Sequence, residues 1–153
     1  MNIRKLTIDD LDLLIKLRID FLLDEKIEFT SQEIEDIKIK CKEYFISAFN
    51  TNNFIAFVAE IDGEAISTAF MSFSERPPRK AFLPYRYGTI YNVLTYEPHR
   101  RKGIATKVLI ALLGEAKAMG ISIVDLLATE DGKKLYEKLD FWSINYTPMR
   151  TEL

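Results

Sequence analysis

The stretch Arg100-Arg101-Lys102-Gly103-Ile104-Ala105 (RRKGIA) joins a run typical of a β-strand to a run typical of an α-helix. Before it, residues 89–96 are rich in β-branched and aromatic side chains, and Pro98 ends this run. After it, apolar residues recur at helical spacing over 104–119, and Gly120 suits a C-terminal cap. We therefore predict a strand, this basic turn and a helix in succession.

Positive charge is concentrated at this turn, since four of the eight residues from 100 to 107 are Arg or Lys. The start of a helix exposes backbone N–H groups, and the helix dipole adds partial positive charge to them. Gly103 allows a ligand to approach the backbone, Ala105 is small, and Thr106 offers a hydroxyl donor. The turn therefore predicts a site for an anion with several charges, such as a pyrophosphate.

Well-known phosphate loops do not match this turn. A Walker loop needs two glycines and a Lys-Ser/Thr pair, and the dinucleotide fingerprint needs G-x-G-x-x-G. An arginine, a glycine and a small residue at offsets 0, 3 and 5 are a weak signal alone, because these residue types are common. The function of the turn therefore depends on its context in the chain.

The rest of the chain alternates between helical and strand patterns. Asp62-Gly63, which readily adopts positive φ, separates two strand-like runs and predicts a β-hairpin. In the second half, strands alternate with helices, which implies right-handed crossovers and locally parallel pairing, so the sheet is predicted to be mixed. The expected strands are 3–8, 54–61, 65–73, 89–96, 121–127 and 141–146. The expected helices are about 9–23, one between Thr30 and Ala48, 104–119, and one from Thr129 to Leu139. Residues 76–87 contain three prolines and are expected to form a loop.

Length and composition narrow the class of protein. The 153 residues fit a single domain spanning 1–153, and 48% hydrophobic residues indicate a globular chain. The longest apolar run, Val108 to Leu113, is far shorter than the roughly 20 residues that cross a bilayer. The N-terminus lacks the apolar core of a signal peptide and Cys41 is the single cysteine, so a cytoplasmic location is expected. The net charge of −2 predicts no general attraction to nucleic acid or to a membrane.

Two motifs resemble those of the GNAT N-acetyltransferases. Arg100-x-x-Gly103-x-Ala105, after a strand ending in Asn92-Val93-Leu94-Thr95, resembles their acetyl-CoA signature R/Q-x-x-G-x-G/A. Leu135–Phe141, LYEKLDF, resembles the family's LYEKLGF block. The motifs cover about 90–141, and the element order is similar from Met1 to about Tyr146. The resemblance implies an α/β (mixed α+β) fold, in which helices flank a central mixed, mostly antiparallel twisted sheet whose fourth and fifth strands splay apart.

The resemblance also implies a chemistry. An amine attacks acetyl-CoA directly in a ternary complex, no metal takes part, and CoA leaves as the thiolate. The splayed strand leaves backbone N–H groups unpaired, and that of Val93 matches the donor to the thioester oxygen. Tyr136 matches the general acid, and it acts either as an acid or as a hydrogen-bond donor to the departing sulfur. The residues expected to bind acetyl-CoA are Val93, Leu94, Thr95, Arg100, Arg101, Lys102, Gly103, Ile104, Ala105, Thr106, Thr129, Gly132 and Tyr136.

The sequence departs from the family pattern at several positions. Thr129 and Gly132 stand where the family often has Asn and Ala, which changes the expected pantetheine contacts. Asp140 replaces a glycine, but Asp tolerates the left-handed conformation that a cap there requires. Thr89 and Tyr91 occupy strand positions where some members carry a basic carboxylate or imidazole. No general base is therefore predicted, and the amine is expected to lose its proton to water or to react as its neutral fraction.

The acceptor is expected to be a primary amine of a small molecule or peptide, and its identity stays open. The resemblance implies that the first two helices and their connecting loop form one wall of the acceptor site. Asp24, Glu25 and Glu28 would then either attract a cationic amine or form a solvated face. Cys41 is expected in the core, and His99 is assigned no role. Because dimers are common in the family, a homodimer is an expectation as well.

Two other functions are weighed. The missing base and the changes at Thr129 and Gly132 also suit an acyl-CoA sensor that binds the ester without turnover. A module that binds nucleic acid through the basic turn is the second, but the net charge of −2 and the lack of an extended basic face count against it. Release of thiol from acetyl-CoA distinguishes an enzyme from a sensor.

Overall fold

The computed structural model describes residues 1–153, which form one five-stranded sheet with helices on both of its faces. The helices and strands follow one another as β1 (Asn2–Lys5), a 3-10 turn (Ile8–Asp10), α1 (Leu11–Asp24), α2 (Ser31–Asn50), β2 (Phe54–Ile61), β3 (Glu64–Arg76), β4 (Tyr85–Thr95), a second 3-10 turn (Glu97–His99), α3 (Ile104–Ala118), β5 (Ile123–Leu126) and α4 (Glu130–Glu137).

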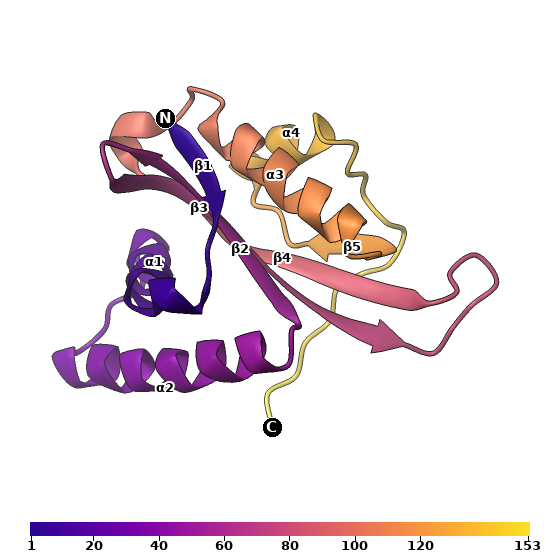
Figure 1. The fold of residues 1–153 in the computed structure, drawn as a ribbon, viewed down its shortest axis with the longest axis horizontal. Helices are drawn as coiled ribbons and strands as arrows, with labels where there is room; N and C mark the ends of the chain where they lie inside the picture. The colour runs from indigo at the N-terminus through magenta and orange to yellow at the C-terminus, as the bar shows by residue number, and fades with distance from the viewer.

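The sheet is mixed, as predicted. Its strands lie in the order β1-β2-β3-β4-β5, and the first four pair antiparallel with their neighbours. β4 and β5 pair in parallel, and α3 forms the crossover between them. Figure 1 shows α1 and α2 on one side of the sheet and α3 on the other. The predicted α/β architecture with a mostly antiparallel sheet is therefore confirmed.

Local sequence signals explain where the first helices and the hairpin lie. Thr7 and Thr30 each open a capping box; in the second, the Glu33 carboxylate accepts the Thr30 N–H at 2.7 Å while the Thr30 hydroxyl accepts the Glu33 N–H. In the hairpin turn, Asp62 and Gly63 have φ values of 51° and 82°. These are short-range effects, and for this reason the sequence predicts them well.

An aliphatic cluster, called the α3 cluster below, joins α3 to the sheet. Val108, Leu109 and Leu112 of α3 are fully buried against sheet residues that include Ile55 and Met71. Each such side chain contributes about 1.5–3 kcal/mol through burial, which fixes α3 and the turn before it on the sheet. None of the helices combines the length and the apolar character that a membrane crossing requires.

An aromatic cluster on the opposite face joins α1 and α2 to β2 and β3. The ring of Phe70 meets those of Phe45 and Phe54 edge-on, with centroid distances of 5.8 and 5.5 Å. Leu14 and Leu17 of α1 are fully buried beside them. Helices therefore pack on both faces of the sheet, and this packing holds β4 and the residues that follow it in a fixed position.

Several predicted strand bounds are wrong. β1 ends at Lys5 rather than at residue 8, because Thr7 already caps the next turn. β4 begins at Tyr85, so the end of the predicted 76–87 loop is strand; the three prolines lie just outside the paired residues. β5 is shorter than expected at both ends.

The last predicted strand does not form. Residues 141–146 contain no strand, and Trp142 and Tyr146 are 81% and 82% exposed. Aromatic and β-branched residues favour a strand only where neighbouring side chains cover them, and here no strand lies beside them. The sheet therefore ends at β5.

Candidate active site

β4 is interrupted by a bulge close to the point where it leaves β5. Tyr91 pairs with Phe70 and Leu94 pairs with Thr68, so β4 has one residue more than β3 between these pairs. Pairing with β5 ends at Ile90. The part of β4 that follows has no partner strand on the β5 side, which agrees with the predicted splaying of these two strands.

Asn92 forms the bulge and is anchored to α1. Its φ is 54°, a left-handed conformation that Asn tolerates better than most residues, and it is only 1% exposed. Its side-chain Nδ2 donates to the carbonyl oxygen of Leu17 at 3.2 Å, and its Oδ1 accepts from Arg18 Nη1 at 3.1 Å. The backbone N–H of Val93, the predicted oxyanion donor, follows directly, and the Val93 side chain packs toward the α3 cluster.

The turn between β4 and α3 presents free backbone amides. Gly103 is the residue before α3 and has a φ of 71°, while Arg101 has a φ of 61°. None of the amides of residues 101–106 donates a hydrogen bond within the chain. A side chain at position 103 would meet nothing within 4 Å, so the space in front of Gly103 is open. The turn has the donors and the room that an anionic ligand requires.

Several predicted ligand-binding side chains are engaged in the protein instead. Arg100 donates from Nη2 to Asp24 Oδ1 at 2.6 Å and from Nε to the Thr95 carbonyl at 2.8 Å. Lys102 donates to the carbonyl oxygen of Pro98 at 2.9 Å. The side chains of Leu94 and Ile104 are buried, so these two residues offer only their backbone to a ligand. The remaining turn residues are exposed or half-buried, namely Arg101, Ala105, Thr106 and Lys107.

Polar contacts tie the C-terminal half of α1 to this end of β4. Asp20 and Asp24 are four residues apart and share one face of the helix, and the Leu17 carbonyl and the Arg18 side chain add contacts one turn earlier. The carboxylate of Asp24 is thereby neutralised by Arg100, which removes it from the set of free acids near the predicted acceptor wall. The contacts are Asn92 with Leu17 and Arg18, Tyr96 with Asp20, and Arg100 with Asp24.

Tyr136 lies on α4 beside the α3 cluster, which Val93 also borders. Its ring meets that of Phe141 edge-on at 6.0 Å, and its backbone carbonyl accepts the N–H groups of Leu139 and Phe141. Burial raises the pKa of Tyr136, and burial is the only cause of the shift. The hydroxyl therefore stays protonated at neutral pH and is available as a donor.

Thr129 and Gly132 both have local roles in α4. The Thr129 hydroxyl accepts the N–H of Gly132 at 3.1 Å and so caps the helix as predicted. A Cβ at Gly132 would lie 3.1 Å from this hydroxyl and 3.2 Å from the ring of Tyr136. Glycine thus lets the tyrosine ring lie close to the helix backbone. Asp140 has a φ of 62°, as predicted for the cap after α4.

A carboxylate that the sequence analysis missed lies at the β4–β5 junction. Asp125 of β5 accepts hydrogen bonds from Tyr87 at 2.6 Å and from Thr89 at 2.8 Å, both on β4. The parallel register places Asp125 opposite Thr89, one pair before the two strands separate. The only sequence signal is an acid inside an apolar strand. No cluster of three or more His, Cys, Asp or Glu side chains forms a metal site.

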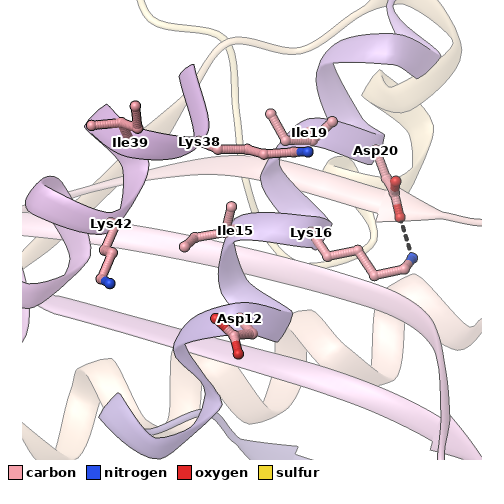
Figure 2. Close-up of a pocket in the computed structure, with 8 residues that line it drawn as sticks. All are labelled: Asp12, Ile15, Lys16, Ile19, Asp20, Lys38, Ile39 and Lys42. Atoms are coloured by element: carbon pink, nitrogen blue, oxygen red, sulfur yellow. Dashed lines mark hydrogen bonds and ion pairs between the residues drawn. The ribbon is translucent and has the colours of Figure 1, made fainter. Parts of the chain in front are cut away.

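Two pockets lie between α1 and α2. The smaller, about 200 Å³, reaches β4 and is called the Tyr91 pocket here; it is lined by Arg18, Cys41, Tyr44, Phe45 and Tyr91. The larger pocket, about 510 Å³, is called the α1–α2 groove. Figure 2 shows Ile15 and Ile19 of α1 facing Ile39 of α2, with the Lys16–Asp20 ion pair at one end of the groove. The residues that line it are Asp12, Ile15, Lys16, Ile19, Asp20, Lys38, Ile39 and Lys42. Of the two, only the Tyr91 pocket is lined by a residue of β4.

Comparison with solved structures supports the fold. A crystal structure of a predicted acetyltransferase with acetyl-CoA from Clostridium acetobutylicum is 31% identical, with a TM-score of 0.85, and the match covers 98% of this chain and 95% of that one. A GCN5-related N-acetyltransferase from Ralstonia eutropha is 20% identical, with a TM-score of 0.77 and 98% and 97% coverage. Glucosamine-6-phosphate N-acetyltransferase from Arabidopsis thaliana is 22% identical, with a TM-score of 0.70 and again 98% and 97% coverage.

Comparison at the level of sequence families agrees with these structures. No curated protein matches the sequence. The family model described as the acetyltransferase (GNAT) family matches residues 19–141, which include the β4 bulge, the β4–α3 turn and Tyr136. The chain therefore belongs to the GNAT family of acetyltransferases.

Proposed function

We propose that the protein transfers the acetyl group of acetyl-CoA to a primary amine of a small molecule or peptide, which attacks directly in a ternary complex. The observation that carries this proposal is the succession, over residues 91–106, of a bulged strand with no partner on its β5 side and a turn with free amides. An extended thioester arm and a pyrophosphate require these two kinds of contact in this order. The acetyl-CoA in the 31% identical Clostridium structure supports the choice of acetyl donor.

The turn would hold the charged end of acetyl-CoA through its backbone. The free amides of residues 101–106 donate to the pyrophosphate, and Arg101 and Lys107 add positive charge nearby. The backbone of Leu94 and Thr95 lines the path of the pantetheine arm. Arg100, already bonded to Asp24 and Thr95, acts by holding the turn in place.

Bond making and bond breaking are assigned to Val93 and Tyr136. The amine nitrogen bonds to the thioester carbon, the C–S bond breaks, and the sulfur leaves with the electron pair. The Val93 N–H stabilises the negative charge that develops on the oxygen. The Tyr136 hydroxyl, kept protonated by its raised pKa, donates to the departing sulfur.

Asp125 is the best candidate to accept the proton that the amine loses. Thr89, to which Asp125 is bonded, lies four residues before Val93, which is about 13 Å along a strand. Direct transfer over this distance is excluded, so the proton would travel through intervening waters. Asp125 would thus serve as the general base, a role for which Thr89 and Tyr91 are not suited.

Calorimetric titration with acetyl-CoA, and with ATP as a control for general phosphate binding, tests the acetyl-donor site. We expect micromolar binding of acetyl-CoA and much weaker binding of ATP. Thiol release in the presence of a panel of primary amines then tests the transfer. Equal affinity for both nucleotides would mean that the turn is only a basic surface.

An acyl-CoA sensor without turnover is the second candidate. The observation that favours it is that β4 carries no carboxylate or imidazole close to Val93, since Thr89 and Tyr91 stand at the positions in question. Such a sensor would bind acetyl-CoA in the titration but release no thiol with any amine. The same two measurements therefore separate the candidates.

A further inference from the structure

Arg18 of α1 is a half-buried cation without a carboxylate partner. Arg4, Arg86 and Arg100 each form an ion pair with an acid, whereas the only hydrogen bond of the Arg18 side chain goes to Asn92 Oδ1 at 3.1 Å. A guanidinium group has five N–H donors, so most of those on Arg18 are unused. The guanidinium also lies over the ring of Phe21, 5.5 Å from its centroid, but no anion balances its charge. Cations that are partly removed from water are normally paired with an anion, which suggests that a ligand supplies the anion for Arg18.

The Tyr91 pocket, which Arg18 lines, offers one cation, two hydroxyl groups and otherwise a thiol and an apolar ring. Tyr44 and Tyr91 join their hydroxyls at 2.9 Å, and because this bond uses one hydrogen, the pair has a second one to donate. Burial raises the pKa of Tyr91, so its hydroxyl stays protonated. Cys41 and Phe45 form the rest of the lining, and no acidic side chain takes part. The pocket therefore matches a small anion.

The acids of α1 that lie nearest the site are bonded elsewhere. Asp20 is paired with Lys16 and accepts the Tyr96 hydroxyl, and Asp24 is paired with Arg100. No rearrangement within the chain is therefore at hand to neutralise Arg18 without breaking an existing ion pair. An anion from outside the chain is therefore the partner that Arg18 can take without breaking an existing ion pair.

The pocket adjoins the point at which the amine must attack. Arg18 is bonded to Asn92, the residue before Val93, and Tyr91 lies two residues before Val93 on β4. Two residues of strand span about 7 Å, which is a chain of a few bonds. The volume of about 200 Å³ is smaller than the pockets that enclose drug-sized ligands, so it suits a group of only a few atoms.

We infer that the Tyr91 pocket binds the anionic group of the acceptor, a carboxylate or a phosphate, so that the substrate is an amine with an anionic group a few bonds away. The inference rests on the proposed acetyl transfer for the role of the amine. Arg18 binds the anion through its guanidinium fork, and the Tyr44–Tyr91 pair donates one further hydrogen bond. The amine is then directed toward the β4 bulge.

The single cysteine of the chain permits a binding test that does not depend on catalysis. Cys41 lines the pocket, so an occupied pocket shields its thiol from alkylation by neutral iodoacetamide. The probes are 5-aminopentanoate, its primary amide, and 5-aminopentyl phosphate. At about ten times the dissociation constant, we expect an anionic amine to slow alkylation about tenfold, because only the free protein reacts. The neutral amide should leave the rate unchanged.

Two substitutions show whether Arg18 is responsible. Arg18→Gln should abolish the protection, while Arg18→Lys should retain part of it. Lys42→Gln removes one charge from the same helix pair but lies in the α1–α2 groove, so protection should persist. Burial raises the pKa of Cys41 and the charge of Arg18 partly offsets this, so replacing Arg18 changes the reactivity of the thiol; each variant is therefore compared with and without probe rather than with the wild type. Circular dichroism of every variant confirms that the fold is retained.

Kinetics of thiol release with the same probes connect the pocket to turnover. In the wild type, kcat/KM should be higher for whichever anionic amine fits, and Arg18→Gln should lower it about 10- to 100-fold through KM, with the neutral amide unaffected. Carboxylate and phosphate probes are compared directly, which identifies the anion. The inference is overturned if neutral and anionic amines protect Cys41 equally, or if Arg18→Gln leaves protection intact. Protection without any thiol release would retain the anion site and reject the acetyl transfer.

Discussion

The guanidinium group of Arg100 lies 2.6 Å from the carboxylate of Asp24, so the first residue of the acetyl-CoA signature is fastened to the end of α1. The same side chain also donates to the Thr95 carbonyl at the end of β4. Arg100 thus connects α1, β4 and the turn before α3. This contact also means that Asp24 is already neutralised and is a poor candidate for attracting a cationic acceptor.

Asp24→Asn should weaken acetyl-CoA binding modestly. The carboxamide cannot balance the Arg100 charge, and an exposed ion pair of this kind contributes about 0.2–1 kcal/mol, so the dissociation constant should rise up to about fivefold. Calorimetric titration measures this change. The KM for the amine should stay the same; a large increase in that KM would instead assign Asp24 to the acceptor site.

Gly103→Glu should abolish binding of acetyl-CoA. The position has open space in front of it, so the new carboxylate would project toward the site assigned to the pyrophosphate and repel it. Gly103→Asn is the matched control, because Asn tolerates the φ of 71° and adds no charge. We expect the wild type to bind acetyl-CoA most tightly and the Asn variant more weakly, while binding by the Glu variant should be undetectable by calorimetry. Retained affinity in the Glu variant would place the site elsewhere.

Tyr136→Phe should lower kcat by about 100-fold or more while leaving the affinity for acetyl-CoA nearly unchanged. The ring packs against Phe141, and phenylalanine preserves this contact, so only the hydroxyl is lost. Single-turnover thiol release gives the rate, and calorimetry gives the affinity. A wild-type kcat in this variant would remove the hydroxyl from the mechanism.

Asp125→Asn should lower kcat about 100-fold near pH 7, if the carboxylate takes the proton of the amine. Part of the loss should be recovered as the pH rises, because a larger fraction of the amine is then neutral. Tyr87→Phe is the control, since it removes one hydrogen bond to Asp125 but keeps the carboxylate. A pH-independent loss in Asp125→Asn would indicate a structural role at the β4–β5 junction.

Arg4→Met should destabilise the fold at neutral pH and have no effect in strong acid. Arg4 bonds Asp10 and Glu60, and its hydrogen bonds hold the pKa of Asp10 below its ordinary value of 3.8. This stabilisation is present above the unfolded pKa of Asp10 and is lost as the pH falls through the lower folded value. Because the pairs are partly solvated, the loss at pH 7 should be about 1 kcal/mol. Urea unfolding of the wild type and the variant from pH 7 to pH 2 tests whether their free energies of unfolding converge as the pH falls.

Features set by neighbours in sequence were predictable, and features set by register were not. The capping box at Thr30, the turn at Asp62-Gly63 and the α3 start at Gly103 depend on a few adjacent residues, and the structure contains all three. The approach of Asp125 to Thr89 depends on how a strand 36 residues away aligns with β4, for which the sequence holds no local signal.

The Asn92 contacts and the C-terminal segment illustrate the same limit. A polar residue inside a strand predicts neither a bulge nor a bond to α1, because the bulge depends on the register with β3 and the bond requires α1 to lie across β4. The run 141–146 has strand-forming composition, but composition does not supply a neighbouring strand. Local sequence patterns predicted the turn before α3, whereas the Tyr91 pocket depends on three elements that meet only in the folded chain.

The exposure of Trp142 determines which spectroscopic signals will report on this protein. It is the only tryptophan, and at 81% exposed its indole is already surrounded by water in the native state. Its emission should therefore change little when the two apolar clusters unfold, and far-ultraviolet circular dichroism is the better measure of stability. Conversely, a blue shift of tryptophan emission in the folded protein would reveal that some surface has covered the segment after Phe141.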